Sequence, residues 1–453
     1  MNIKDDFILS QINEGYLVGG SVRDALMGKS FVDRDIAIKG AEDFAHKLSE
    51  QFNATFIVLD PEYKIYRLVL EDKVNYLDIS EIQGGVNIED DLERRDFAMN
   101  AIAIDLSNGE IIDPFEGKKD IENKIIRHIK DSNFEEDPLR ILRAFRFAST
   151  TGFELSNDTK LCIEKYKHLL FTPAKERINY ELMKLFGGAK CSETLLVMDE
   201  FGILEELFPY VKEMKKVPPN THHHLDLFHH VVETVRNIEE LYLNSTKEEK
   251  EHLDSVGFGG FPRINHLKLA GFLHDIGKFS TWTIEESGRH RFIKHDDIGA
   301  KMAIPFLKDL KFSKKQIEYI STMIKTHIYP SNVIDAPDLN EKVKMRYLRK
   351  MGVDVIDNIY LAKADRLSAR GEAITEEIVK ANLDGLDALL NFYLEKRETL
   401  KPLPKLLDGK EIMEIKGIKQ SPDLGKIISA LKEAQLNGEV NSKDEAIDFV
   451  KGL

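Results

Sequence analysis

Asp33 and Asp35, two aspartates that flank a single arginine, have the spacing that most clearly indicates chemistry. In a β-strand, residues two apart point to the same face, so both carboxylates would project together, about 6–7 Å apart along the backbone, while Arg34 points away. Two converging carboxylates repel each other unless a divalent cation holds them, and hard oxygen ligands select Mg²⁺. With nucleotide phosphates alongside, the pair predicts a two-metal centre for phosphoryl transfer. The alternative is that both aspartates decorate an exposed edge strand.

A glycine-rich turn lies upstream of these aspartates. The sequence YLVGGS at 16–21 is typical of a strand that enters a turn, and VRDAL at 22–26 is typical of the helix that follows. Glycines let the backbone approach a phosphate at the positive end of the helix, and Arg23 adds a cation. Gly-Gly turns before helices are common, so the turn indicates a nucleotide site only in combination with the aspartates.

A second candidate site is rich in histidine. Eleven of the fourteen histidines lie between residues 222 and 327, and the pair HD at 274–275 ends an apolar helical stretch, LAGFLHDIG. Imidazoles and carboxylates are ligands of transition metals. A single histidine on an apolar face is usually a core residue, so the prediction of a metal site rests on the whole set. Its members are His230, His274, Asp275, His295, His327 and Asp365.

The elements that must position these residues differ along the chain. Over residues 15–126 short β-like runs alternate with helical patterns, which predicts an α/β architecture; from Arg127 onwards amphipathic stretches predict an all-helical remainder. Pro218-Pro219 precedes the histidine-rich region, and the sequence KPLP at 401–404 precedes a short final part. The expected segments are a head at 1–126, a helical neck at 127–215, a helical metal domain at 216–400 and a small helical tail at 401–453.

Composition limits the class of protein. The 453 residues are 42% hydrophobic and 31% charged, which fits a globular protein with buried cores. The two cysteines, Cys162 and Cys191, exclude a disulfide scaffold and fit a reducing cytosol, and neither a signal sequence nor an apolar membrane span is expected. The net charge of −14 is concentrated in the head, whereas residues 127–190 carry 12 basic and 9 acidic residues that could face phosphates. The oligomeric state is left open.

Five ordered motifs resemble the class II tRNA nucleotidyltransferase and poly(A) polymerase family. They are LVGGSVRDALMGKSFVDRDIAI at 17–38, RRDFAMNAIA at 94–103, IIDPFEG at 111–117, EEDPLRILRAFRF at 135–147, and the tail GKEIMEIKGIKQSPDLGKIISAL at 409–431. The resemblance implies a mixed-sheet head with helices, similar to that of DNA polymerase beta. It also implies template-independent addition of C and A residues, from CTP and ATP, to the 3′ end of tRNA.

The resemblance further implies a role for individual residues. Those of the head are Gly20 and Arg23 for the triphosphate, Asp33 and Asp35 for Mg²⁺, Asp78 as a third carboxylate that activates the attacking hydroxyl, and Arg95 and Asp96 for the nucleotide and its ribose.

The neck carries the residues expected to choose the base. Asp137 and Arg140 are three apart on the helix predicted to open at DPLRILRAF, about 60° apart on one face. A carboxylate that accepts from the amino group and a guanidinium that donates to the ring nitrogen would read cytosine or adenine and refuse guanine or uracil. Arg143 and Arg146 continue the row and resemble further arginines of the family's nucleotide site. The alternative is a solvated i,i+3 ion pair.

The histidine order H…HD…H…H…D resembles the HD superfamily of metal-dependent phosphohydrolases, which implies a transition metal such as Ni²⁺, Mn²⁺ or Co²⁺. Whether this site hydrolyses phosphate esters stays open. One departure concerns the segment EIQGGVNI at 81–88, which is shorter than the flexible segment that CCA-adding members usually have before RRDF. The alternatives are therefore a CC-adding specialist, a poly(A) polymerase, and an HD phosphodiesterase whose head only binds nucleotide. Ala98, where the family usually has threonine, is a smaller departure.

Overall fold

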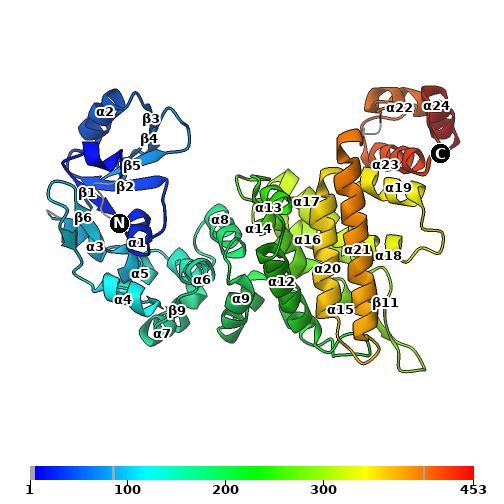
Figure 1. The fold of residues 1–453 in the computed structure, drawn as a ribbon, viewed down its shortest axis with the longest axis horizontal. Helices are drawn as coiled ribbons and strands as arrows, with labels where there is room; N and C mark the ends of the chain where they lie inside the picture. The colour runs from blue at the N-terminus through cyan, green and yellow to red at the C-terminus, as the bar shows by residue number, and fades with distance from the viewer. Residues whose placement is uncertain (1–5, 84–86, 401–403) are drawn as a thin grey trace. The chain divides into compact units, whose positions relative to one another are not determined.

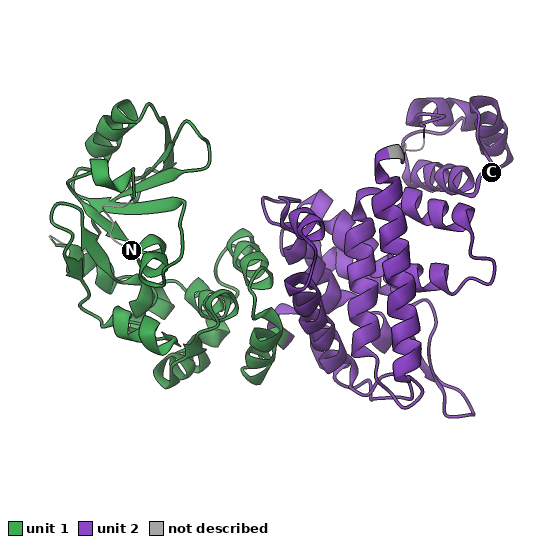
Figure 2. Ribbon diagram, viewed as in Figure 1, with its two compact units in different colours: residues 1–204 green, residues 205–453 purple. Residues whose placement is uncertain are grey.

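A computed structural model describes residues 6–83, 87–400 and 404–453. Its two compact units are residues 1–204 and residues 205–453 (Figure 2). Gly84–Val86, in the short segment before RRDF, and Lys401–Leu403, at the expected start of the tail, lie outside the described residues. Within the described ranges, no helix combines the length and the apolar character needed to cross a lipid bilayer.

The head is built on one mixed sheet of seven strands. These are β1 (Tyr16–Val18), β2 (Asp33–Ile38), β3 (Thr55–Asp60), β4 (Ile65–Val69), β5 (Tyr76–Glu81), β6 (Ala103–Asp105) and β7 (Ile111–Ile112). Their order across the sheet is β3-β4-β5-β2-β1-β6-β7 (Figure 1). Neighbouring strands are antiparallel, except that β2 and β5 run parallel. The predicted mixed-sheet head is confirmed.

The central strand β2 lies between β5 and β1, and its side chains alternate as a period of two requires. Arg34 points to the face opposite Asp33 and Asp35, where its guanidinium forms a buried ion pair of 2.6 Å with Asp6. The helices of the head are α1 (Gly20–Leu26), α2 (Ala41–Gln51), α3 (Ile88–Glu93) and α4 (Gly117–Asn123). α2 packs on β3, β4 and β5 and buries Phe44 and Leu48, so the sheet edge that carries the carboxylates is supported by an apolar core.

The neck is helical apart from a short parallel pair of strands, β8 (Ile125–Ile126) and β9 (Glu154–Leu155). Its helices are α5 (Asp131–Glu136), α6 (Leu139–Thr151), α7 (Asn157–Tyr166), α8 (Lys175–Phe186) and α9 (Cys191–Glu200). α6 packs against α8 and α9 through a face that buries Leu142 and Phe145. This packing leaves the arginine-bearing side of α6 free to line a site.

The second unit is a bundle around the fully buried helix α14 (Arg263–Leu273), which packs against α12 (Leu227–Leu243), α17 (Lys314–Thr326) and α20 (Val355–Ser368) (Figure 1). Around them lie α10 (Ile203–Leu207), α11 (Val211–Met214), α13 (Lys247–Asp254), α15 (Lys278–Thr281), α16 (His295–Asp309), α18 (Tyr329–Ile334), α19 (Glu341–Met351), α21 (Glu376–Lys396) and the hairpin β10 (Trp282–Ile284) with β11 (His290–Phe292). The chain ends in α22 (Gly409–Lys416), α23 (Pro422–Asn437) and α24 (Lys443–Gly452). These last helices share an apolar core of their own that includes Ile412, Leu431 and Val450.

Candidate nucleotide site and candidate metal centre

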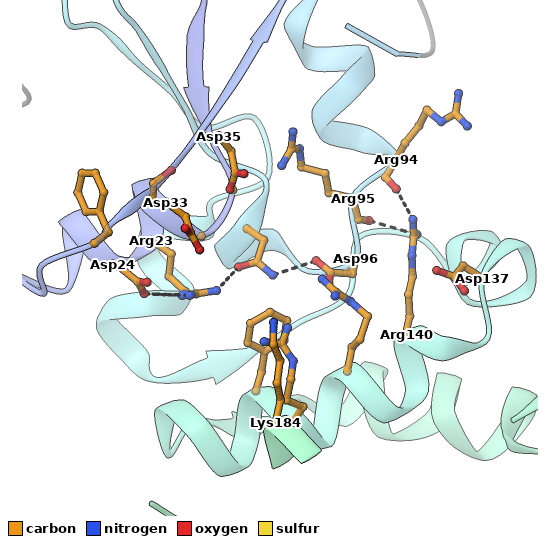
Figure 3. A pocket seen from close by; sticks show the side chains of 18 of the residues that line it. Arg23, Asp24, Asp33, Asp35, Arg94, Arg95, Asp96, Asp137, Arg140 and Lys184 are labelled. Carbon is orange, nitrogen blue, oxygen red and sulfur yellow. Dashed lines mark hydrogen bonds and ion pairs between the residues drawn. The ribbon is translucent and has the colours of Figure 1, made fainter. Parts of the chain in front are cut away.

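A pocket of about 790 Å³ in the first unit brings together most of the residues predicted for the head and neck (Figure 3). Figure 3 shows Asp33 and Asp35 of β2 on the head side and Arg140 and Lys184 on the neck side. The predicted residues that line the pocket are Gly20, Arg23, Asp33, Asp35, Arg95, Asp96, Asp137, Arg140, Arg143 and Arg146. Asp78 does not line it but lies beside Asp35 on the neighbouring strand.

The strand carboxylates form a cluster short of positive charge. The parallel register pairs Asp35 with Asp78, so both project from adjacent strands. Arg67 engages Asp78 through two hydrogen bonds of 2.7 Å each. Burial, together with the charges of Asp78 and Asp33, raises the pKa of Asp35 to about 6. A carboxylate set that resists ionisation in this way fits a divalent cation, because the cation would supply the missing charge.

The phosphate turn places its essential glycine one residue earlier than predicted. Gly19 has a φ of 71°, and a Cβ there would lie 3.1 Å from Nη1 of Arg95 and 3.3 Å from Oδ2 of Asp35. Gly20, in contrast, is the first residue of α1, and a Cβ there would meet only Arg23, at 3.6 Å. The steric requirement therefore lies at Gly19, which separates the strand from the helix and lets Arg95 approach the carboxylates.

A chain of hydrogen bonds connects the phosphate turn to the ribose-sensing segment. Arg23 donates to the side-chain oxygen of Asn100 at 2.7 Å, and the amide nitrogen of Asn100 donates to Asp96 at 2.9 Å. Arg143 completes the chain, with its Nη2 2.5 Å from the other oxygen of Asp96. Burial opposes ionisation of Asp96, but Arg143 and Asn100 outweigh it and lower the pKa of Asp96 to about 2. Asp96 is thus a fixed anion that orients its neighbours.

Asp137 does not lie on the arginine-bearing helix, which corrects the sequence prediction. It has φ −136° and ψ 89° and forms the break between α5 and α6, because the residue before Pro138 is disfavoured in the helical region. Its carboxylate pairs with Arg177 of α8 at 2.9 Å. Arg140 donates instead to the backbone carbonyl of Arg94, at 2.6 Å. The i,i+3 ion pair considered as the alternative is therefore not formed between these two described residues.

Arg143 and Arg146 are held from below by Glu181 of α8, at 3.3 Å and 2.8 Å. Arg146 also stacks on the ring of Phe147, with 3.7 Å between its guanidinium carbon and the ring centroid. The sequence analysis missed pocket residues contributed by the turn, the RRDF segment and α8; these are Gly19, Arg94, Asn100, Phe147, Arg177 and Lys184. A signal existed for α8, since positions 177, 181 and 184 carry charged residues at the spacing of one helical face.

The second unit brings all six predicted histidines and aspartates together around Asp275. Nε2 of His230 and Nε2 of His274 each lie 3.2 Å from its Oδ2, whereas Nε2 of His295 and of His327 lie 3.3 Å and 3.5 Å from its Oδ1. Asp365 closes the first set, 3.2 Å from His230. Two groups of ligand atoms that share Asp275 result, which is the arrangement of a two-metal site.

The donor atoms of this cluster are oriented for a cation. Nδ1 of His274, His295 and His327 lies 2.7–2.8 Å from a backbone carbonyl, so these protons are donated outward and each Nε2 turns its lone pair inward. Both oxygens of Asp275 and Nε2 of His274 are buried without a hydrogen-bond partner. Burial opposes protonation of His274, but Asp275 and Asp365 outweigh it and raise its pKa to about 10. The residues present therefore fit a transition metal.

A helix end allows adjacent His274 and Asp275 to face the same centre. α14 stops at Leu273, and the turn that follows leads through Gly277 into α15. A Cβ on Gly277 would lie 2.0 Å from the carbonyl oxygen of His295 and 2.7 Å from the backbone nitrogen of Gly299. Only glycine lets the start of α16 approach this closely, and this contact brings His295 to the cluster.

Comparison with known proteins gives the class of this chain. Family models match the Poly A polymerase head domain at residues 15–127, the Probable RNA and SrmB- binding site of polymerase A at 152–215, and the HD domain at 227–370. The A-adding tRNA nucleotidyltransferase of Deinococcus radiodurans is 30% identical over 96% of this chain and 94% of its own length. The chain therefore belongs to the tRNA nucleotidyltransferase family and is an enzyme of the nucleotidyltransferase class with an HD domain.

Other relatives and solved structures extend the comparison. The CC-adding tRNA nucleotidyltransferase of Thermus thermophilus is 28% identical over 98% of this chain and 95% of its own length. The CCA-adding enzyme of Bacillus subtilis is 38% identical but matches 43% of this chain and 52% of its own length. The structure of the Bacillus stearothermophilus CCA-adding enzyme in complex with CTP has a similar fold, with a TM-score of 0.56 at 22% identity over 100% of this chain and 98% of that one.

Proposed function

We propose that the head and neck add C and A residues to the 3′ end of tRNA, with CTP and ATP as donors and without a nucleic-acid template. The observation that carries this proposal is the pocket of about 790 Å³, in which the aspartates of β2, the phosphate turn and the pair Asp137 and Arg140 line one cavity. A site for the triphosphate and a site for the base edge therefore lie within reach of one nucleotide.

In the proposed reaction the 3′-hydroxyl of tRNA attacks the α-phosphorus of the nucleotide. The bond from this phosphorus to the bridging oxygen breaks, and pyrophosphate leaves. Asp33 and Asp35 would hold Mg²⁺, which when bound neutralises phosphate charge and lowers the pKa of the hydroxyl. Asp78 would accept the hydroxyl proton, and this role requires its ion pair with Arg67 to open. Arg23 would bind the triphosphate beside the turn.

Base choice is assigned to the neck. The carboxylate of Asp137 would accept from the amino group of cytosine or adenine, and the guanidinium of Arg140 would donate to the ring nitrogen beside it. Arg95 would contact the nucleotide at the phosphate turn, and Asp96, fixed as an anion, would sense the ribose hydroxyls. Arg143 and Arg146 would contribute to the electrostatic attraction of the triphosphate.

A CC-adding specialist is the second candidate function, and two observations favour it. The relatives matched over 98% and 96% of this chain are named CC-adding in Synechocystis and Thermus thermophilus, whereas the Bacillus CCA-adding enzymes match 43%. The segment at 81–88, which contains the undescribed residues 84–86, is short. A poly(A) polymerase would instead extend an RNA by many adenosines.

One labelling experiment separates these functions. Three transcripts of one tRNA, ending before the CCA sequence, after C and after CC, are incubated with each of the four labelled nucleoside triphosphates. Full CCA synthesis requires C on the first two transcripts and one A on the third. Addition that stops after two cytidines identifies the CC specialist, whereas terminal A on the third transcript alone identifies an A-adding enzyme. Incorporation of U or G at comparable rates would reject the protein-template hypothesis.

We further propose that the HD centre binds Ni²⁺, Mn²⁺ or Co²⁺ and hydrolyses phosphate esters at RNA ends, such as a 3′-phosphate or a 2′,3′-cyclic phosphate. The observation that carries it is the unpartnered, inward-facing donor set around Asp275. When bound, the metal supplies hydroxide near neutral pH from a bound water. Lys278, 2.6 Å from Asp275, adds a positive charge at the edge of this set that would attract the phosphate.

A pair of variants tests whether the two centres work independently. Asp275→Ala should abolish metal-stimulated hydrolysis and metal uptake by the second unit while nucleotide addition persists. Asp35→Ala should have the opposite effect. Hydrolysis that persists in Asp275→Ala would reject the HD assignment without touching the transfer proposal.

A cytoplasmic location is part of the proposal. Cys162 and Cys191 are both free thiols buried in the neck, a state that a reducing compartment maintains.

A further inference from the structure

A second cluster of metal-ligating side chains lies in the neck, apart from both centres described above. It consists of His128, Asp131 and Cys162, and the ligand atoms of the three lie within 4.8 Å of one another. His128 lies two residues after β8, Asp131 opens α5, and Cys162 lies on α7. Nε2 of His128 is 2.9 Å from Oδ1 of Asp131. Three separate segments of the chain thus present an imidazole, a carboxylate and a thiol to one point.

The imidazole of His128 is oriented by Thr159. The hydroxyl oxygen of Thr159 lies 3.1 Å from Nδ1 of His128, and it accepts from the backbone N–H of the same residue at 2.9 Å. In the tautomer that donates the Nδ1 proton to this hydroxyl, Nε2 presents its lone pair toward Asp131 and Cys162. A hydrogen bond at the outer ring nitrogen is what fixes metal-binding histidines in proteins.

Burial around the cluster is one-sided. His128 is 8% exposed and Cys162 is 2% exposed, whereas the side chain of Asp131 is 51% exposed. An ion can therefore enter past Asp131 and keep a water as its fourth ligand. Lys165 lies 3.1 Å from the second oxygen of Asp131 and 4.7 Å from the centroid of the Tyr166 ring, so its charge is on the solvent side of the carboxylate.

We propose that His128, Asp131 and Cys162 bind a transition metal ion of the zinc class. Thiolate and imidazole ligands favour Zn²⁺ and Co²⁺ and disfavour Mg²⁺, which prefers oxygen. On binding, a sulfur–metal bond forms at Cys162 and the thiol proton leaves to solvent. The ion is structural, since the cluster does not line the nucleotide pocket.

The position of the cluster gives the ion a consequence for the nucleotide site. His128 forms a β-bridge with Phe97, directly after the ribose-sensing Asp96. In α5, the side chain of Asn133 donates to the backbone carbonyls of Glu93 and Arg95, at 3.0 Å and 2.8 Å. An ion that joins the start of α5 to α7 would fasten this support beneath the segment that carries Arg95 and Asp96.

Cobalt absorption tests the proposal on the full-length protein. After removal of metals by a chelator, the chain is titrated with Co²⁺ alone, and the thiolate-to-cobalt charge-transfer band is followed in the near ultraviolet. The HD centre has no cysteine among its ligands and gives no such band. The band should appear in the unmodified chain and in Cys191→Ser, the matched control, and should be absent in Cys162→Ser. In His128→Gln the affinity for Co²⁺ should fall at least tenfold.

The exposed ligand provides a variant that is safe for folding. Asp131→Asn changes a half-exposed side chain, and it should lower the affinity for Co²⁺ at least tenfold while the circular dichroism spectrum stays unchanged. Absence of the band from the unmodified chain would overturn the proposal. A band that persists in Cys162→Ser, or an affinity unaltered in Asp131→Asn, would do the same.

Discussion

Arg177 of α8 forms an ion pair of 2.9 Å with Asp137, the carboxylate proposed to read the base, whereas Arg140 is fastened to the backbone of the RRDF segment. The two base-reading groups are therefore positioned by different partners, one on a helix and one on a strand-side loop. Asp137, which has no helical backbone to hold it, depends on Arg177 for its orientation. Arg177 is accordingly a positioning residue.

Loss of this partner should loosen base selection. In Arg177→Ala, we expect discrimination between CTP and UTP to fall about tenfold, or about 1.4 kcal/mol, because Asp137 is free to rotate. Single-turnover incorporation of each nucleotide measures this ratio. Arg177→Lys should restore part of it, and Lys160→Ala, an exposed change on α7, should leave it unaltered. Equal discrimination in all four proteins would show that Asp137 needs no partner.

Removal of the guanidinium donor should have a larger effect. Arg140→Ala deletes the proposed hydrogen bond to the ring nitrogen, which is worth about 1–3 kcal/mol of base selection. Triphosphate affinity should change less, since Arg23 lies at the other end of the pocket and keeps its contacts. Comparison of KM and kcat for the four nucleotides checks this. Selectivity that stays unchanged would reject the protein-template hypothesis.

The carboxylate cluster should trade stability for metal binding. The pKa of Asp35, raised to about 6, means that the folded state holds this proton more tightly than the unfolded chain does, so its contribution to stability is lost as the pH rises from about 4 through 6. Without Mg²⁺, Asp35→Asn should therefore be more stable than the unmodified chain above pH 6, by about 1–3 kcal/mol, and equal to it near pH 4. Urea unfolding in EDTA measures the difference. Mg²⁺ should stabilise only the unmodified chain, and a less stable variant at pH 7 would contradict the argument.

The close contact at Gly277 should be essential for the HD centre. Gly277→Ala introduces a Cβ that overlaps the carbonyl of His295, so α16 must move away and take a metal ligand with it. We expect a loss of about 1–3 kcal/mol in stability and at least tenfold weaker metal binding, with nucleotide addition retained. Gly425→Ala is the matched control, because a Cβ there meets nothing within 4 Å. Normal metal content in Gly277→Ala would refute the prediction.

The parts that followed a simple period were predictable from the sequence. The period of two in β2 correctly put Asp33 and Asp35 on one face and Arg34 on the other, and the order of the histidines correctly predicted that His274, Asp275 and their partners meet. Helix spacing failed at Asp137, because Pro138 starts a new helix and the spacing rule applies only within one helix. The error was local, since both side chains still line the same pocket.

Contacts between distant segments were beyond the reach of periodicity. Nothing in the turn sequence distinguishes Gly19 from Gly20; the difference arises from Arg95, which is contributed by a loop about 75 residues away and approaches one of them. The same holds for Arg177 and Glu181, whose partners lie on α6 and at Asp137. The proposed ligands His128, Asp131 and Cys162 match no spacing motif, and only the packing of α7 against α5 brings them together.

The hydrogen-bond chain through Asn100 restricts which side chains that position tolerates. Its oxygen accepts from Arg23 while its nitrogen donates to Asp96, so the amide must offer both functions in one fixed direction. Aspartate would set a second anion against Asp96, and alanine would leave Asp96 and Arg23 each with an empty bonding position in a buried region. In a survey of all nineteen replacements, position 100 should therefore accept none at full activity, although Asn100 need not touch the base, the ribose or the metal ions.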